Sequence, residues 1–320
     1  MKKILVTGAT GRLGSGVLEC LMQRSAPANI VALARDHHKA QGLVLKGIEV
    51  RYADYSNYDT LVSAFEGVDT IYMVSAVAFT DRTAQHKNVI DAARFSGVRH
   101  VIYTSIQRTS DDLCPIEGVT DSDIATESML ENSGMFFTIV RHPLYANDLP
   151  MFIGAQAALE GFSCPAGDGR IALACYQELA EASAVLLSQD GHENRRYLLN
   201  SGQAWSFSDI AETLSGLTGK PITYESISSP AFMLAREREG WPAHVAQFLS
   251  GWYAAIKAGA FDESSGALEE LLGRKPKQLE SLLKDAFGLQ GLALLPDPIS
   301  DGKRGEERPV FCDERLLQKG

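Results

Sequence analysis

Cysteine is scarce in this sequence, and the cysteines present form no recognisable site. The five cysteines include no Cys-x-x-Cys pair and no zinc-type spacing, so we expect reduced thiols and no metal. No apolar stretch is long enough to cross a bilayer. Lys2 and Lys3 precede only a strand-length apolar run, which is not a signal peptide. These absences predict a cytoplasmic protein with no membrane partner.

Basic residues are also in deficit. The 30 lysines and arginines against 40 acidic residues give a net charge of −10, which argues against nucleic acid and anionic membranes as partners. Hydrophobic residues make up 45% of the chain and charged residues 22%, as in an ordinary globular protein. The expected partner is therefore a small molecule, and the chain is expected to be a monomer or a homodimer.

Lysine is missing altogether between Lys87 and Lys220. Short-chain dehydrogenases that interconvert alcohols and carbonyls usually place a tyrosine four residues before a lysine, which lowers the pKa of the phenol so that it can pass a proton. Here Tyr103 is followed four residues later by Gln107. The sequence also has no nucleophile elbow. The usual proton relay is therefore predicted to be absent.

The first half of the chain contains a regular alternation of β-rich and helical segments. The β-rich runs are residues 4–7, 30–34, 48–52, 70–75, 100–105 and 136–141. Between them, apolar residues recur at helical spacing, as in Leu13, Val17 and Leu21. This alternation predicts an α/β fold with a Rossmann-type, doubly wound parallel sheet covered by helices on both faces.

After about residue 150 the alternation stops, and a smaller α+β substrate lobe is predicted over the carboxyl ends of the strands. Its helices are expected at residues 178–188, 207–217, 242–258 and 279–287, and its strands near Tyr197 and Ile222. A stripe of apolar residues from Trp241 to Ile256 has helical spacing, which indicates lobe core or a subunit contact.

Three segments are predicted from these patterns. Residues 1–150 form an NAD(P)-binding Rossmann domain, and residues 151–290 form a substrate lobe that is interleaved with it. Residues 291–320 are expected to be disordered, because the segment 301–320 carries ten charged side chains and few apolar ones.

Residues 7–14, Thr-Gly-Ala-Thr-Gly-Arg-Leu-Gly, follow the first predicted strand and open a helix. In such a turn Gly8 permits the tight bend, Gly11 lets the backbone approach a pyrophosphate, and Gly14 allows close packing of helix on strand. The helix N-terminus adds free N–H groups and a positive dipole end for the phosphates. The turn, beginning at Thr7, therefore predicts a bound dinucleotide.

The end of the second predicted strand bears on the choice between NADH and NADPH. An acidic residue there usually accepts from the ribose 2′-OH of NAD, whereas arginine suits the 2′-phosphate of NADP. The strand is followed by Arg35, with Lys39 one turn later, which favours NADPH. Asp36 leaves NADH possible, although it is equally suited to cap a helix.

Small or acidic residues follow the next two strands. Asp54 is a candidate acceptor for the adenine amine, and the alternative is a turn-capping aspartate. Ser75 and Ala76 give a cofactor room to pass, although small residues are common at strand ends in any case. Both interpretations stay open for each of these residues.

A protein that binds a hydride carrier but has no proton relay can have one of two kinds of function. The protein either senses NADP(H) without chemistry or reduces an acceptor that needs little proton catalysis. Quinones fit the second, because hydride addition restores aromaticity and leaves a phenolate that solvent can protonate, and cationic dyes need no proton. For such acceptors the enzyme mainly holds nicotinamide and acceptor face to face.

The chain resembles the NmrA-like family of atypical short-chain dehydrogenases, and within it the quinone- and dye-reductase branch. The resemblance runs from residue 3 to about residue 288 through the motifs TGATGRLG, VALARDHHKA, VRYADY, AQHKNVIDAA, VIYTS, ATESML, TIVRHPLY, AGDGRI, GHENRRY and LLGRKP. It implies NADPH bound by Gly8, Gly11, Arg12, Leu13, Gly14 and Arg35. It also implies a nicotinamide near Ser75 and residues 141–145, with Arg170 close by, and a quinone-type acceptor in the cleft between the lobes.

The sequence departs from its relatives around the expected acceptor. Asp123 stands where relatives often have histidine, and His142 with the following proline replaces Asn-Gly or Asn-Ala. We hypothesise that His142 and Tyr145 orient the acceptor as the catalytic residues. The alternative for His142 is a histidine hydrogen-bonded within a strand end, and for Tyr145 it is packing in the core or at the rim of the cleft.

Three further residues are candidates, and two of them have competing interpretations. Phe79 and Asn147 are placed in the substrate cleft, although Phe79 is equally well explained as a loop aromatic. His86 begins a helical stretch and is interpreted as a surface or capping residue rather than a ligand.

The sequence thus predicts an NADPH-dependent oxidoreductase that transfers hydride to quinones or similar conjugated acceptors, such as dyes. One alternative is a non-catalytic NADP(H)-binding redox sensor whose charged tail docks a partner. Another is a dedicated biosynthetic reductase, suggested by the altered cleft residues.

Overall fold

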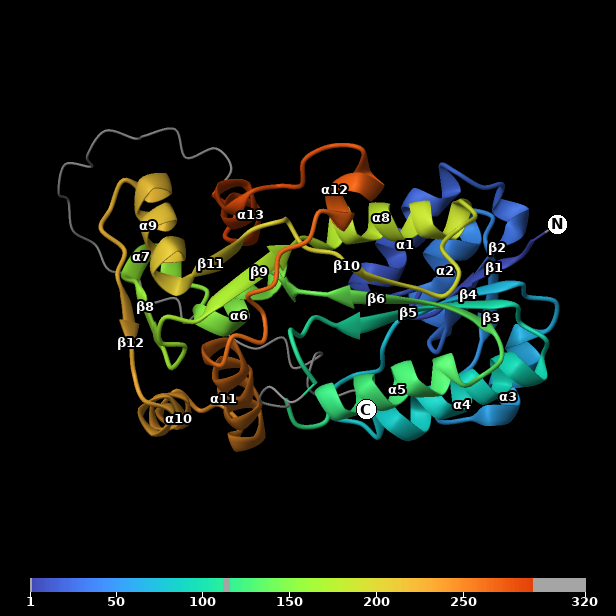
Figure 1. Ribbon diagram of the computed structural model, residues 1–320, viewed down its shortest axis with the longest axis horizontal. Coiled ribbons are helices and arrows are strands. Elements are labelled where there is room, and N and C mark those ends of the chain that lie inside the picture. The colour runs from blue at the N-terminus through green and yellow to red at the C-terminus, as the bar shows by residue number, and fades with distance from the viewer. Residues whose placement is uncertain (1, 112–115, 290–320) are drawn as a thin grey trace.

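The structure, a computed structural model, describes residues 2–111 and 116–289. Its main element is an all-parallel sheet of seven strands in the order β10-β6-β5-β4-β1-β2-β3 (Figure 1). The strands are β1 (Ile4–Val6), β2 (Ile30–Ala34), β3 (Glu49–Tyr52), β4 (Thr70–Met73), β5 (His100–Ile106), β6 (Phe136–His142) and β10 (Arg195–Leu198). The strand order reverses between β1 and β4, so the sheet is doubly wound, as predicted.

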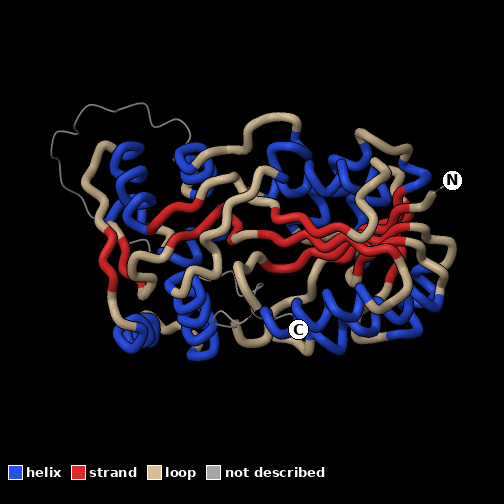
Figure 2. The backbone as a smooth tube through the Cα atoms, viewed as in Figure 1, coloured by secondary structure: helices blue, strands red, loops and turns tan. Residues whose placement is uncertain are grey.

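The central strands are apolar along their length because helices cover both faces of the sheet (Figures 1 and 2). Leu5 and Ile71 pack into one core, and the alternate residues Val6 and Tyr72 pack into the other. The first layer is made of α3 (Tyr58–Phe65), α4 (Arg82–Phe95) and α5 (Thr120–Glu131), and the second of α1 (Arg12–Met22), α2 (His37–Leu45) and α8 (Tyr176–Ser188).

The strand near Tyr197 was expected in the smaller lobe, and this expectation is wrong. It is β10, which pairs with β6 in the large sheet, with Tyr197 beside Val140. The reason is the preceding helix: α8 packs on α1 so closely that a Cβ on Gly16 would lie 3.1 Å from the Cβ of Ala180. This contact brings the chain back to the sheet edge after it has entered the lobe.

The smaller lobe has its own core. Its sheets are β11-β9-β7 and β12-β8, built from β7 (Leu144–Tyr145), β8 (Phe162–Cys164), β9 (Arg170–Ala174), β11 (Ala204–Ser206) and β12 (Tyr224–Ser226). Its helices are α6 (Leu149–Ile153), α7 (Ala157–Glu160), α9 (Phe207–Thr218), α10 (Ser229–Arg238), α11 (Ala243–Lys257) and α13 (Leu279–Ala286). The stripe from Trp241 to Ile256 packs in this core, which confirms the lobe-core interpretation.

The lobe begins where β6 ends, because β7 follows it after a single residue and pairs with β9. The lobe therefore lies at the carboxyl edge of the large sheet (Figure 1). The short helix α12 (Ala267–Leu272) packs back on α8. No helix in the described part of the chain is long and apolar enough to cross a membrane. The predicted disordered tail, residues 291–320, lies outside the described residues.

Candidate functional site

The glycine turn between β1 and α1 has no room for a side chain at Gly14 and a backbone conformation at Gly8 that favours glycine. Gly8 has φ +58°, and a Cβ on Gly14 would lie 2.3 Å from the Gly8 carbonyl oxygen. Gly11 is the N-cap residue of α1 and supplies no side-chain cap to the first turn of the helix. The N-terminal N–H groups of α1 thus remain available to an anion. Leu13, by contrast, packs its side chain into the core, so any contact it makes with a cofactor is through its backbone.

Thr7 joins β1 to β4 from inside the protein. Its hydroxyl donates to the carbonyl of Tyr72 at 3.1 Å and accepts from the N–H of Val74 at 2.8 Å and the phenol of Tyr55 at 2.6 Å. Tyr55 also donates to the carbonyl of Val74. The Thr7 hydroxyl is fully buried, so this side chain holds the glycine turn and the end of β4 in register.

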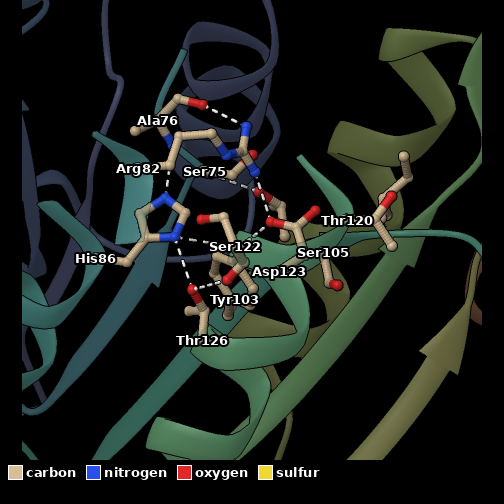
Figure 3. A network of polar contacts seen from close by, with 12 residues as sticks. Ser75, Ala76, Arg82, His86, Tyr103, Ser105, Thr120, Ser122, Asp123 and Thr126 are labelled. Carbon is tan, nitrogen blue, oxygen red and sulfur yellow. Dashed lines mark hydrogen bonds and ion pairs between the residues drawn. The ribbon is translucent and has the colours of Figure 1, made fainter. Parts of the chain in front are cut away.

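The two residues after Val74 are pinned in the same way, by side chains that replace the ladder bonds lost at the strand end (Figure 3). Ser75 donates its N–H to Thr104 Oγ1 at 2.9 Å, and Ala76 donates its N–H to His86 Nε2 at 2.8 Å. Arg82 donates to the Ala76 carbonyl at 2.6 Å. Side chains from α4 and β5 therefore hold the segment at which the sequence predicts that a cofactor passes.

Arg82 and Asp123 form a buried ion pair at this edge, with side chains 6% and 2% exposed (Figure 3). Oδ1 of Asp123 accepts from Nη2 of Arg82 at 2.5 Å and from the phenol of Tyr103 at 2.5 Å. Burial and the charge of Asp123 raise the pKa of Tyr103. A lysine in this place would lower that pKa, so the surroundings of Tyr103 are the reverse of a proton relay.

Glu127 ties the ends of β5 and β6 to α5. It accepts from Ser105 at 2.5 Å, from Arg108 through two bonds of 2.9 Å and from Arg141 at 2.7 Å and 3.2 Å. Burial raises the pKa of Glu127, but the hydrogen bonds from Arg141, Arg108 and Ser105 outweigh it and lower the pKa to about 2. A permanently charged carboxylate thus fixes the β5–β6 edge.

These buried groups were missed by sequence reasoning. The expectation that His86 is a surface or capping residue is wrong, because the side chain is fully buried and holds Ala76. Asp123 and Glu127 lie four residues apart in α5 and share one face, a spacing visible in the sequence. Their partners are 14 to 41 residues away in the chain, and no local pattern identifies them.

His142 and Tyr145 are in direct contact, and Tyr145 packs on the face of the sheet opposite to Tyr103. Nδ1 of His142 lies 3.1 Å from the phenol oxygen of Tyr145, and burial lowers the pKa of His142 to about 3, so the imidazole is neutral at pH 7. Its Nε2 is buried without a partner among the described residues. Burial raises the pKa of Tyr145, and the charges of Asp148 and Asp123 add to the increase. The pair offers neutral hydrogen-bonding groups rather than an acid.

The residues expected around the adenosine end of the cofactor are two capping aspartates, Asp36 and Asp54, and two exposed cations, Arg35 and Lys39. Asp36 caps α2 by accepting from the N–H groups of His38 and Lys39, which lower its pKa, so the capping interpretation is confirmed. Asp54 accepts from the N–H and hydroxyl of Ser56, as in the turn-capping alternative. Arg35 and Lys39 are exposed beside them, and Arg35 lies 3.8 Å from Asp54.

Phe79 and Asn147 border the junction of the lobes. Phe79 is 48% exposed, and its ring meets His244 and Phe248 of α11 at centroid distances of 5.3 Å and 5.1 Å. Asn147 accepts from the N–H of Tyr176 at 2.9 Å and thereby caps the start of α8. Both residues therefore sit where the smaller lobe meets the Rossmann domain.

Arg170 lies apart from this group. It starts β9, whose other end, Ala174, pairs with Tyr145; four residues of strand span roughly 13 Å. Its guanidinium donates to the carbonyl of Ala204 and lines an open depression of about 490 Å³ on the surface of the smaller lobe, with Trp205 and Asp209. This placement gives no support to the expected position of Arg170 beside the nicotinamide.

The sequence and fold of this chain are similar to those of known NADP(H)-binding reductases. A sequence profile of the NmrA-like family matches residues 1–282. Quinone oxidoreductase 2 of Escherichia coli (strain K12) is 37% identical over 289 residues, which cover 89% of this chain and 99% of that protein. The crystal structure of the NADPH-dependent quinone oxidoreductase of E. coli complexed with NADPH superposes with a TM-score of 0.83 at 36% identity, covering 89% of this chain and 99% of that chain. Triphenylmethane reductase of Citrobacter sp. complexed with NADP(H) superposes with a TM-score of 0.82 at 31% identity, with the same coverage.

Proposed function

This chain belongs to the NmrA-like family, and from that premise we propose that it is an NADPH-dependent oxidoreductase that transfers hydride to quinones or similar conjugated acceptors. The observation that carries the proposal is the bond from Tyr103 to Asp123, in the same parallel sheet as the strand that leads into an open phosphate-binding turn. Such a site can hold a dinucleotide, and because burial and Asp123 raise the pKa of Tyr103, this phenol is a poor proton donor to an alkoxide.

The residues present fit NADPH. The uncapped N-terminus of α1 suits the pyrophosphate, and Gly8 and Gly14 keep side chains out of its way. Arg35 and Lys39 are exposed cations at the end of β2, where the 2′-phosphate of NADP would need them. The pinned segment at Ser75 and Ala76 borders the path of the cofactor. When bound, NADPH supplies a hydride from its nicotinamide ring.

The chain's own groups then orient the acceptor. His142 and Tyr145 present a buried imidazole and a phenol that can hydrogen-bond an acceptor oxygen, and Phe79 and Asn147 border the opening between the lobes. Reduction of a quinone gives a phenolate stabilised by its aromatic ring, which takes its proton from water. The protein therefore needs to position the acceptor rather than to protonate it.

The test is to follow NADPH absorbance with purified protein and a panel of quinones and triarylmethane dyes, alongside NADPH binding measured by its fluorescence. Enzyme-dependent oxidation with several quinones is expected. NADPH binding without oxidation of any acceptor contradicts the proposal and indicates a redox sensor. Oxidation confined to one unusual acceptor indicates a dedicated biosynthetic reductase.

The acceptor-binding role of Tyr145 has a matched control in this chain. Tyr145→Phe is expected to raise the KM for quinones several-fold with an unchanged Kd for NADPH. His192 and Tyr197 form a similar pair at the edge strand β10, with Nδ1 of His192 2.8 Å from the phenol oxygen of Tyr197. Tyr197→Phe should leave both constants unchanged; equal effects of the two variants would exclude a specific role for Tyr145.

A further inference from the structure

Asp148 connects the start of α1 to the start of α8. It ends the short helix η2 (Ala146–Asp148), which directly follows β7. Its Oδ1 accepts from Nη1 of Arg12 at 2.7 Å, and its Oδ2 accepts from the phenol of Tyr176 at 2.8 Å. Each oxygen of one carboxylate is thus used by a residue at the first turn of a different helix.

Tyr176 extends this connection to the acceptor side of the site. The centroid of the Tyr176 ring lies 4.3 Å from that of the Tyr145 ring. The guanidinium carbon of Arg12 lies 5.8 Å from the centroid of the Tyr176 ring. Tyr145 in turn contacts His142. A continuous series of contacts therefore runs from the phosphate-binding turn, through Asp148 and Tyr176, to the pair that faces the acceptor.

The contact with Asp148 leaves Arg12 able to bind a second anion. A guanidinium has five N–H donors in a planar fork, and the bond to Asp148 uses only Nη1. The Arg12 side chain is 56% exposed, whereas that of Asp148 is 21% exposed. Holding one edge of the fork removes much of the rotamer freedom that a free arginine would lose on binding a phosphate.

We infer that Asp148 is a positioning residue: it aims Arg12 at the pyrophosphate of the cofactor and, through Tyr176, holds Tyr145 in place for the acceptor. This inference rests on the proposed function for the roles of Arg12 and Tyr145. It adds a direct connection between the cofactor subsite and the acceptor subsite. If Asp148 had no positioning role, its negative charge would only repel the pyrophosphate, and its removal would tighten NADPH binding. If Asp148 positions Arg12, its removal weakens NADPH binding.

The first experiment measures the Kd of NADPH by its fluorescence, without any acceptor. Asp148→Ala should weaken NADPH binding about tenfold, within the range of coupling between contacting residues. Asp148→Asn should restore at least half of the loss, because its amide can accept from Arg12 and contact Tyr176. The double variant Arg12→Ala with Asp148→Ala should bind no more weakly than Arg12→Ala alone, because Asp148 acts through Arg12.

The second experiment separates the two arms of the connection. Tyr176→Phe keeps the ring against Tyr145 but loses the bond to Asp148, so it should raise the KM for quinones with less than a twofold change in the Kd for NADPH. Glu19 lies on the same helix as Arg12 and forms an exposed ion pair with Lys46. Glu19→Ala should change neither the KM for quinones nor the Kd for NADPH.

Each result decides between the explanations. Unchanged or tighter NADPH binding by Asp148→Ala overturns the inference, as do additive effects in the double variant or a Tyr176→Phe variant with wild-type kinetics. None of these three results changes what the wild-type protein binds or reduces, so the proposed function stands. Wild-type protein that does not bind NADPH at all overturns the proposed function, and this inference with it.

Discussion

The N–H of Ala76 donates to Nε2 of His86 at 2.8 Å, and this bond determines the tautomer of a fully buried imidazole. A backbone N–H can only donate, so Nε2 carries no proton. Nδ1 lies 2.8 Å from Oγ1 of Thr126, whose own hydrogen is donated to the carbonyl of Ser122. Nδ1 is therefore the donor, and the neutral ring braces the loop after β4.

This neutral imidazole predicts a loss of stability in mild acid. Burial, with the charge of Arg82, lowers the pKa of His86 to about 3. Between the ordinary pKa of about 6.5 and this value, the unfolded chain binds a proton that the folded protein does not. The free energy of unfolding should fall by about 1.4 kcal/mol per pH unit for this group as the pH decreases from 6.5. The full contribution is present only above pH 6.5.

The measurement is urea unfolding of wild type and His86→Gln between pH 7.5 and 5.0. The variant should be less stable at pH 7.5, because it lacks the rigid ring that bridges Ala76 and Thr126, but its stability should depend less on pH. His100 and His142, whose pKa values burial lowers to about 4 and about 3, remain in both proteins and cancel in the comparison. Parallel pH profiles would contradict the assignment.

Gly14→Ala should damage the phosphate-binding turn. Its Cβ would lie 2.3 Å from the carbonyl oxygen of Gly8, which is backbone and cannot rotate away. We expect a loss of stability of about 2 kcal/mol or more and a large loss of NADPH affinity. Gly42→Ala is the control, because it lies in α2 with no atom within 4 Å, and should stabilise by about 0.5–1 kcal/mol. Similar effects at both positions would rule out the steric argument.

Arg35→Ala should discriminate between the two nicotinamide cofactors. A hydrogen bond to a charged group contributes about 1.5–3 kcal/mol, so the Kd for NADPH should rise roughly tenfold or more while that for NADH changes less than twofold. Lys46→Ala removes another exposed cation, at the C-terminal end of α2, and should change the Kd for neither cofactor. Titration of all three proteins with both cofactors is the test, and equal losses for NADPH and NADH would refute a 2′-phosphate contact.

Glu127→Gln should be strongly destabilising without any change at the protein surface. It leaves the buried Arg108 with only the exposed Asp111 as counter-charge, and breaking a buried ion pair costs about 3–5 kcal/mol. Glu131→Gln, in the same helix, removes an exposed ion pair with Arg196 and should cost less than about 1 kcal/mol. Thermal or urea unfolding at pH 7.5 measures both; comparable losses would show that the buried pair is not specially important.

Local patterns in the sequence identified most of the fold. The six strand predictions in the first half each agree with an observed strand to within about two residues, because a buried parallel strand is a short apolar run between turns. The glycine turn was equally clear, since its spacing reflects backbone conformation at Gly8 and Gly14. The strand at residues 195–198 was recognised as well, but its place beside β6 was not, because the packing of α8 on α1 decides it.

The sequence by itself determined the α/β alternation, the phosphate-binding turn and the absence of a lysine partner for Tyr103. Each of these depends on residues within a few positions of one another, where backbone geometry relates spacing directly to structure. Only the tertiary structure decided that Tyr103 meets Asp123, that His86 supports Ala76 and that Asp148 joins Arg12 to Tyr176. Apart from the ten-residue step from Ala76 to His86, those contacts span 20 to 136 residues of chain. All depend on how helices and strand ends pack at one edge of the sheet, which no local pattern in the sequence encodes.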